Sequence, residues 1–233
     1  MFTFKQFVIH QDQTAMKAGT DGVLLGAWCD ISGAYKILDI GTGTGLIALM
    51  CAQRALDAAI SAIEIDPDAC SQAQQNIRES KFGDRISVIN SDFRNYYIAN
   101  SQKFSHIVSN PPFFTATLGC PDQKRQLARH TLSLPFAELI KGVACMLDMG
   151  GKFSVIIPWS EKLDFVRLCA LRGLHLCRKT AVISREGNEP IRAMLSFSNI
   201  ILPLIQNQLI IRDSHGNYTT SYKQLTSDFY LKF

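Results

Sequence analysis

The stretch Tyr35–Gly45 reads Y-K-I-L-D-I-G-T-G-T-G, and the apolar run Leu46–Ala52 follows it directly. A short strand that leads through closely spaced glycines into a helix is typical of ligand-binding turns in parallel α/β sheets. Glycines at 41, 43 and 45 remove Cβ atoms where the backbone turns sharply and lies against a ligand at a helix N-terminus. We therefore expect a nucleotide-type site at the carboxyl end of this strand.

Strand-like runs and helical patterns alternate after this loop, which indicates a parallel sheet with crossover helices. The expected strands are 35–40, 60–65, 86–90, 106–109 and 152–157, and the expected helices are 46–54, 67–79, 134–147 and 161–171. Two further strand-like runs, 174–184 and 191–197, predict a terminal antiparallel hairpin. The predicted fold class is α/β: a doubly wound, mostly parallel, seven-stranded sheet with helices on both faces.

A length of 233 residues, with 47% apolar and 19% charged residues, excludes a disordered, collagen-like or coiled-coil chain. We expect one domain: an N-terminal arm and helix (1–30), a core (35–200) and a C-terminal extension rich in aromatic residues (208–233). No apolar stretch approaches the roughly 18 residues that span a bilayer. The N-terminus lacks the pattern of an export signal, so we expect a cytoplasmic protein without membrane attachment.

Seven cysteines are scattered without a C-x-x-C pair, so neither a zinc cluster nor a disulfide framework is expected, and no metal site is predicted. The net charge of +4 is uneven, because residues 152–192 contain eight basic and four acidic side chains. A basic region of this size permits contact with a polyanion such as nucleic acid, but a solvated face has the same appearance in sequence.

The next predicted strand ends in A-I-E-I-D and places Glu64 or Asp66 about 20 residues beyond the glycine loop. A carboxylate at this point can accept hydrogen bonds from both hydroxyls of a ribose. A dinucleotide fingerprint requires its third glycine one residue later than Gly45, but that residue is Leu46, which disfavours a nicotinamide cofactor.

Together these features resemble the class I S-adenosylmethionine-dependent methyltransferases, whose fold is Rossmann-like. The resemblance implies that the loop residues lie under the amino acid portion of the cofactor, that Glu64 holds the ribose and that Ile65 packs on the adenine. It also implies that the Asp92 carboxylate accepts a hydrogen bond from the adenine amino group and that the Phe93 ring contacts the adenine. The alternative is that Asp92 only shapes a turn. The loop residues concerned are Asp39, Gly41, Gly43 and Gly45.

The fourth predicted strand runs into N-P-P-F, residues Asn110, Pro111, Pro112 and Phe113. An amino group on a planar ring or carbonyl is a poor nucleophile because its lone pair is delocalised. The Asn110 side-chain oxygen and the Pro111 carbonyl oxygen can accept hydrogen bonds from the two N–H groups of this amino group and favour a more tetrahedral nitrogen. The two prolines hold that carbonyl in place. Asn110 is neutral and cannot act as a general base. Phe113 offers a stacking face for a flipped base, worth about 1 to 3 kcal/mol.

This tetrapeptide resembles the N/D-P-P-Y/F/W signature of methyltransferases that act on adenine N6, some guanine N2 groups or glutamine amides. F-K-Q-F (4–7), A-M-K-A-G-T-D-G-V-L-L-G-A-W (15–28), K-R-Q-L-A-R-H (124–130) and D-F-Y-L-K-F (228–233) resemble the bacterial tRNA1(Val) (adenine-N6)-methyltransferase family over nearly the whole length. The resemblance implies N6-methylation of the adenosine just 3′ of the anticodon, position 37, in a valine tRNA, with S-adenosylmethionine as donor. No obligate protein partner is implied.

Thr20 and Asp21 lie where related enzymes have a segment that contacts the methionine end of the cofactor. The alternative is that Asp21 caps the following helix. Lys124, Arg125 and Arg129 are candidates for phosphate contacts on the rim of the site. Lys179, Arg185 and Arg192 extend that footprint if the terminal hairpin lies beside the pocket, and otherwise form a solvated face.

Three alternatives remain at this point. A protein glutamine N5-methyltransferase needs the same Asn-Pro-Pro apparatus, although such enzymes usually carry a helical recognition domain first and only 38 residues precede Asp39 here. Ribosomal RNA or DNA adenine is a second acceptor class. A cofactor-binding module without catalysis is the third alternative.

Overall fold

A central sheet carries every segment for which the sequence predicts a strand after residue 30. The computed structural model of the protein describes residues 1–14, 17–112 and 134–232, and the sheet in this part has eight strands in the order β10-β8-β9-β7-β6-β3-β4-β5. The strands are β3 (Lys36–Ile40), β4 (Ala59–Glu64), β5 (Ile86–Asn90), β6 (Phe104–Ser109), β7 (Leu147–Pro158), β8 (His175–Arg185), β9 (Pro190–Ser198) and β10 (Ile205–Arg212). Only β9 runs antiparallel to its neighbours in this sheet.

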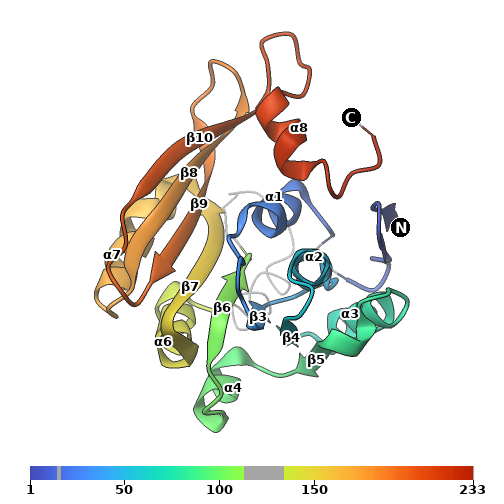
Figure 1. The fold of residues 1–233 in the computed structure, drawn as a ribbon, viewed down its shortest axis with the longest axis vertical. Coiled ribbons are helices and arrows are strands. Elements are labelled where there is room, and N and C mark those ends of the chain that lie inside the picture. The colour runs from blue at the N-terminus through green and yellow to red at the C-terminus, as the bar shows by residue number, and fades with distance from the viewer. Residues whose placement is uncertain (15–16, 113–133, 233) are drawn as a thin grey trace, which may run out of the picture.

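Helices cover both faces of the sheet (Figure 1). On one face lie α1 (Thr20–Trp28), α2 (Leu46–Arg54), α3 (Pro67–Arg78) and α8 (Thr220–Thr226), and on the other lie α4 (Phe93–Ala99), α6 (Phe136–Met146) and α7 (Lys162–Ala170). Short 3-10 turns, η1 (Gly83–Arg85) and η2 (Trp159–Glu161), precede β5 and α7. The buried side chains of each face form a separate apolar cluster, so the sheet is the middle layer of a three-layer fold.

The doubly wound α/β prediction is confirmed, and the seven predicted strands are all present. The eighth, β10, pairs parallel with β8 at the edge of the sheet. Its first four residues are exposed and mostly polar, so no hydrophobic alternation marks it in the sequence. Helix α4 was also missed, because its seven residues are too few to show a helical period.

The two ends of the chain pack on each other. The N-terminal arm forms β1 (Phe2–Thr3) and β2 (Val8–Ile9), which pair with each other and not with the main sheet. The Lys5 N–H donates to the Phe229 carbonyl oxygen at 2.8 Å, and the rings of Phe4 and Tyr230 stack with centroids 5.9 Å apart. The C-terminal aromatic residues therefore hold the N-terminal arm in place. In the described part of the chain, every helix is too short or too polar to cross a membrane.

Helices α4 and α6 approach closely because Gly142 has no side chain. A Cβ built at Gly142 would lie 2.4 Å from Phe93 Cε1 and 2.6 Å from Tyr97 Cδ1, and both rings are buried.

We expect Gly142→Ala to lower the free energy of unfolding by about 1 to 3 kcal/mol despite the better helix propensity of alanine, because the rings have to move. Urea denaturation measures this. Cys145→Ala, at an exposed position of the same helix, should change stability by less than about 0.5 kcal/mol, and equal effects of both variants would contradict the contact.

Candidate active site

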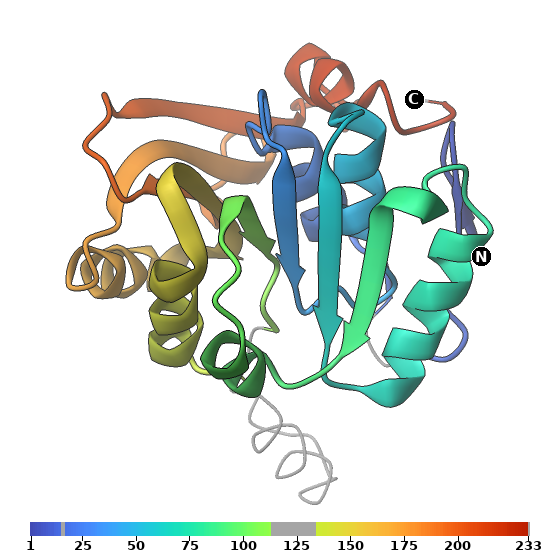
Figure 2. The ribbon, with the colours of Figure 1, turned by 60° about the horizontal axis from the view of Figure 1, so that its bottom comes forward.

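The glycine loop, Glu64 and Asn110 lie at the carboxyl ends of the central strands of the sheet. Strands β3, β4, β5 and β6 are parallel, so their carboxyl ends meet there (Figure 2). The strand order reverses between β3 and β6, since β4 and β5 follow on one side and β7 on the other. In open α/β sheets a ligand binds outside the carboxyl ends of the strands at such a switch point. The glycine loop follows β3 and Asn110 follows β6, so the two motifs flank it.

The glycine loop has the backbone that its sequence predicts. Gly41, Gly43 and Gly45 have φ of +71°, +56° and +82°, a region that side chains with a Cβ disfavour. The N–H groups of Gly41 and Thr42 donate to the Ile63 carbonyl oxygen at 2.9 and 3.0 Å, which ties the loop to β4. Gly45 is the N-cap of α2, so the loop ends at the positive end of a helix.

Glu64, at the end of β4, is the acid that contacts the loop. Its carboxylate accepts hydrogen bonds from the Gly43 N–H at 2.8 Å and from the Asp66 N–H at 3.0 Å, and the residue is 8% exposed. The Asp66 carboxylate instead caps α3, accepting from the Asp68 N–H at 2.9 Å and the Ala69 N–H at 3.3 Å. Of the two acids that the sequence offers, Glu64 is the one at the glycine loop. Ile65 beside it is half-buried.

Asp39 is fully buried beneath the loop. Its Oδ2 accepts from the Thr42 hydroxyl at 2.6 Å and from the Ala48 N–H at 3.1 Å, while Oδ1 has no partner among the described residues. Desolvation raises the pKa of Asp39 to about 7, against the two hydrogen bonds, which lower it. The carboxyl group therefore ties the start of α2 to the loop and leaves one oxygen for another donor.

Asp92 and Phe93 are placed by the start of α4. The Asp92 carboxylate caps this helix through the Arg94 N–H at 2.8 Å and also accepts from Arg94 Nε at 2.9 Å. The hydrogen bonds from the Arg94 side chain hold the pKa of Asp92 below its usual value. Phe93 is 4% exposed and belongs to the apolar cluster under α6, so protein already surrounds its ring.

Asn110 lies directly after β6, where the Ser109 hydroxyl donates to the Ile40 carbonyl oxygen at 2.9 Å and joins the ends of β6 and β3. Its Oδ1 is buried and has no hydrogen-bond partner among the described residues. A buried oxygen without a donor is costly unless a ligand supplies one. Pro111 is buried and Pro112 is exposed, whereas Phe113 lies outside the described residues.

Thr20 and Asp21 open α1, with Gly19 as its N-cap and no side-chain cap. The capping alternative for Asp21 is therefore wrong, because the helix begins before it and its carboxylate lies in the first turn. Asp21 Oδ2 instead accepts from Arg192 Nε of β9 at 2.8 Å. This ion pair joins the terminal hairpin of β8 and β9 to the first turn of α1, so the start of β9 lies beside the start of α1.

Of the other candidates for RNA contact, two lie on β8 and three lie outside the described residues. Lys179 is half-buried in the middle of β8, and Arg185, at the end of β8, donates to the Ser214 carbonyl oxygen. Lys124, Arg125 and Arg129 lie outside the described residues. The footprint predicted for the basic residues thus stays a prediction.

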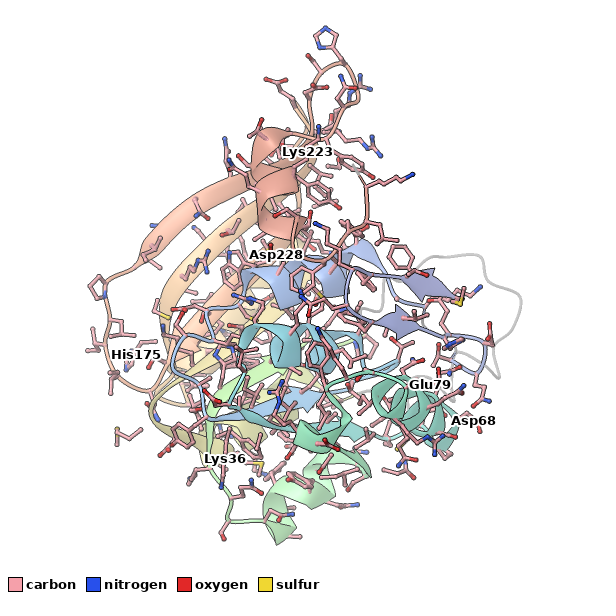
Figure 3. All side chains as sticks on the ribbon, turned by 45° about the vertical axis from the view of Figure 1, so that its right-hand side comes forward. Lys36, Asp68, Glu79, His175, Lys223 and Asp228 are labelled. Carbon is pink, nitrogen blue, oxygen red and sulfur yellow. The ribbon has the colours of Figure 1, made fainter. Side chains whose placement is uncertain are left out.

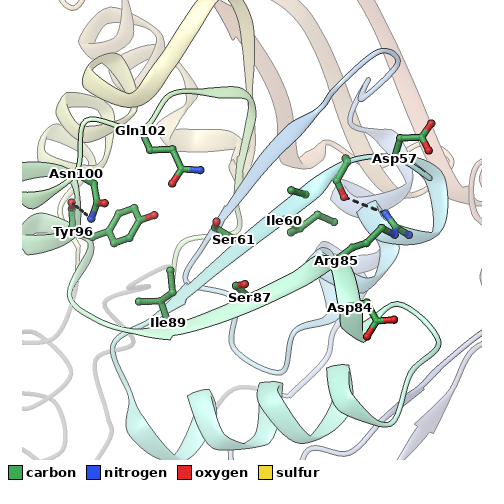
Figure 4. Close-up of a pocket in the computed structure, with 12 residues that line it drawn as sticks. Asp57, Ile60, Ser61, Asp84, Arg85, Ser87, Ile89, Tyr96, Asn100 and Gln102 are labelled. Atoms are coloured by element: carbon green, nitrogen blue, oxygen red, sulfur yellow. Dashed lines mark hydrogen bonds between the residues drawn. The ribbon is translucent and has the colours of Figure 1, made fainter.

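A surface groove elsewhere contains none of the predicted site residues. It lies along the amino ends of β4 and β5, between Asp57 and Asp84 at one end and Tyr96, Asn100 and Gln102 at the other (Figure 4). Among the described residues, no cluster of three or more His, Cys, Asp or Glu side chains is arranged to hold a metal ion.

Sequence reasoning missed three residues that shape the site. Thr42 holds Asp39, Ser109 joins β6 to β3, and the Asn90 side chain donates to the carbonyl oxygens of Glu64 and Ile65 at 2.9 and 3.2 Å. Each lies at the end of a strand or in the loop, and that position is the signal that could have identified it. Thr42 belongs to the glycine-loop motif without being one of its glycines, whereas Ser109 and Asn90 lie outside both motifs.

The model of the methyltransferase small domain family matches residues 23–165, more than half of the chain. A predicted O-methyltransferase from Agrobacterium tumefaciens shares the fold with a TM-score of 0.70 at 19% identity, over 90% of this chain and 96% of that one. A putative class I S-adenosylmethionine-dependent methyltransferase from Listeria monocytogenes has a TM-score of 0.56 at 16% identity, over 80% and 62%. The chain is a methyltransferase of the small-domain class.

The particular family follows from one curated relative. The tRNA1(Val) (adenine(37)-N6)-methyltransferase of Bacteroides fragilis is 46% identical over 99% of this chain and 98% of its own length. This chain belongs to the tRNA1(Val) (adenine(37)-N6)-methyltransferase family. The family predicted from the glycine loop, the N-P-P-F motif and the terminal segments is confirmed.

The burial of Asp39 predicts a pH dependence of stability. Its folded pKa of about 7 lies above the ordinary value of 3.8, so the folded protein binds this proton more tightly than the unfolded chain. The resulting stability is complete below pH 4 and is lost as the pH rises through 7, by up to about 4 kcal/mol.

In Asp39→Asn an amide keeps the Oδ2 acceptor and carries no titrating proton. We expect the free energy of unfolding of the wild type to fall relative to Asp39→Asn between pH 4 and pH 8. Urea denaturation of both proteins across this range measures the difference. Two parallel curves would contradict the predicted shift.

Proposed function

We propose that this protein transfers the methyl group of S-adenosylmethionine to the exocyclic N6 of an adenosine in tRNA, at position 37 of a valine tRNA. The observation that carries the proposal is the buried Asn110 Oδ1, which has no hydrogen-bond partner among the described residues and lies next to the glycine loop at the switch point of the sheet. The relative from Bacteroides fragilis is named for this reaction and matches over 98% of its length.

The residues at the glycine loop fit this cofactor. S-adenosylmethionine supplies an electrophilic methyl group on a sulfonium centre. A carboxylate has about four lone-pair positions, so Glu64 can accept from ribose hydroxyls while it keeps its two backbone hydrogen bonds. The buried Asp39 Oδ1, without a partner in the described residues, can take a further donor. The lowered pKa of Asp92 keeps its carboxylate an acceptor, which suits an adenine amino group.

Asn110 is proposed to handle the acceptor amino group. Its Oδ1 accepts one N–H, and the Pro111 carbonyl accepts the other, so the nitrogen lone pair is directed out of the plane of the base. The amide is neutral and takes no proton, so the proton leaves the nitrogen to solvent as the new bond forms. Positioning is therefore the main contribution of these residues. Phe113 is proposed to stack on the flipped base.

The basic residues are proposed to bind the phosphates of the tRNA. Lys124, Arg125 and Arg129 follow the N-P-P-F motif within about 20 residues, and Lys179 lies on the terminal hairpin. Arg185 and Arg192 can contribute only if they keep or exchange their protein partners.

The first test is methyl transfer from labelled S-adenosylmethionine to total tRNA from a strain that lacks the gene, followed by nucleoside analysis. The proposal expects the label in N6-methyladenosine. Label in ribosomal RNA or in a glutamine of a protein, with none in tRNA, would overturn the substrate.

Asn110→Ala separates catalysis from cofactor binding. We expect kcat to fall by about 10² to 10³, because the acceptor amino group loses its positioning partner. Affinity for S-adenosylhomocysteine, measured by calorimetry, should change by less than about threefold, since Asn110 contacts the acceptor.

Ser61→Ala is a control on β4 away from the predicted site, and it should keep both activity and affinity. A protein without catalytic function would instead show equal effects of Asn110→Ala and Ser61→Ala.

A further inference from the structure

Helix α3 buries two amide side chains that neither the cofactor motif nor the acceptor motif includes. Gln72 is 2% exposed and Asn76 is 1% exposed. Buried amides are costly unless they are hydrogen-bonded, so their partners indicate what they do. Both bind the backbone of the N-terminal arm, some 60 residues earlier in the chain.

Asn76 joins that arm to the glycine loop. Its Oδ1 accepts from the His10 N–H at 2.9 Å, and its Nδ2 donates to the His10 carbonyl oxygen at 2.8 Å. The same Nδ2 donates to the Thr44 carbonyl oxygen at 2.9 Å. One nitrogen therefore contacts both backbones, and the arm must lie directly against the loop.

Gln72 fixes the next part of the arm. Its Oε1 accepts from the N–H groups of Asp12 and Gln13 at 3.1 and 3.2 Å. Outside the helix, His10 Nε2 lies 3.3 Å from the carboxylate of Glu79, which Figure 3 shows at the end of α3 beside the N-terminal strands. The backbone from residue 10 to residue 13 is thus held at three places by α3.

The fixed segment leads to the start of α1. The Gln11 side chain accepts from the Ala18 N–H at 2.9 Å, which brings the residues before Thr20 back to the beginning of the segment. Thr14 is 9% exposed, and its hydroxyl oxygen has no hydrogen-bond partner among the described residues. A buried hydroxyl of this kind is expected where a ligand completes the surroundings.

We propose that Gln72 and Asn76 are positioning residues of the cofactor site. They hold residues 10–14 against the glycine loop, so that this segment is a wall of the space that S-adenosylmethionine occupies. The inference rests on the proposed function, because it needs the cofactor at the glycine loop. It adds a role for two residues of α3 that make no contact with the reacting atoms.

The test uses the whole protein and S-adenosylhomocysteine as the probe. Gln72→Ala removes the acceptor for two backbone N–H groups and leaves the glycine loop untouched. We expect its Kd for the probe to rise about tenfold, because the binding-competent arrangement of the segment is populated less. Amide exchange at residues 12 and 13 should become faster. The KM for S-adenosylmethionine should rise, with kcat at saturating cofactor within about twofold.

Two variants are the controls. Gln72→Glu keeps an acceptor oxygen for the two N–H groups but loses the Nε2 donor to Gln75 Oε1, so its affinity and exchange should lie between those of Gln72→Ala and the wild type. Gln74→Ala, at an exposed position of the same helix, should change neither. If Gln72→Ala does not give a cooperative melting transition, Gln72→Met keeps the buried volume without the acceptor and is measured instead.

Faster exchange at residues 12 and 13 without a change in Kd would overturn the proposal, because the segment would then be held without being a wall of the site. Unchanged exchange would also overturn it, since the clamp would have no effect. Absence of probe binding by the wild type would instead overturn the proposed function, and this inference with it. Normal wild-type binding with an unaltered Gln72→Ala protein contradicts the inference alone.

Discussion

The contact of the Glu64 carboxylate with two backbone N–H groups holds together the part of the fold on which the site depends. The N–H of Gly43 belongs to the loop after β3, and the N–H of Asp66 belongs to the turn between β4 and α3. Hydrogen bonds to a carboxylate are stronger than those between neutral groups. One side chain therefore fixes the loop, the end of β4 and the start of α3 relative to one another. The proposed ribose contact uses the positions of the carboxylate that remain.

The rest of the site extends from this point in two directions. Toward the centre of the sheet, the Ser109 hydroxyl joins the end of β6 to β3 and places Asn110 at the switch point. Toward α3, the Asn76 side chain donates a hydrogen bond to the Thr44 carbonyl oxygen and ties the N-terminal arm to the same loop. The Asn110 amide, the loop and the arm are thus positioned by side-chain hydrogen bonds to backbone oxygens, which suits the proposed reaction, in which positioning is the main contribution.

The sequence predicts the parts of the molecule whose signal is local. The strand, the glycines and the acid at the glycine loop lie within 30 residues, and the spacing of G-x-G-x-G and the N-P-P-F motif sufficed to predict where they are placed. The helix α2 was predicted at 46–54 and is observed at Leu46–Arg54. The spacing alone left Glu64 and Asp66 open, and the resemblance chose Glu64. In the structure the Glu64 carboxylate contacts the loop, while the Asp66 carboxylate caps α3.

What the sequence could not show depends on partners far along the chain. Gln72 and Asn76 appear on a helix as ordinary polar residues, and their burial is explained by partners in the N-terminal arm and, for Asn76, in the glycine loop. The partner of Asp21 is Arg192, 171 residues away, so the sequence could not tell an ion-paired Asp21 from one that caps the helix. Strand β10 has an exposed polar half and gives no alternating pattern.

The position of the methyl group on the RNA decides whether this site acts on adenosine 37. Transcripts of a valine tRNA with adenosine or guanosine at position 37 are incubated with the protein and S-adenosylmethionine, and nuclease fragments are mapped by mass spectrometry. We expect one added methyl group, on the fragment that contains adenosine 37, and none on the guanosine transcript. Equal methylation of both transcripts would contradict the assignment of this site to that adenosine.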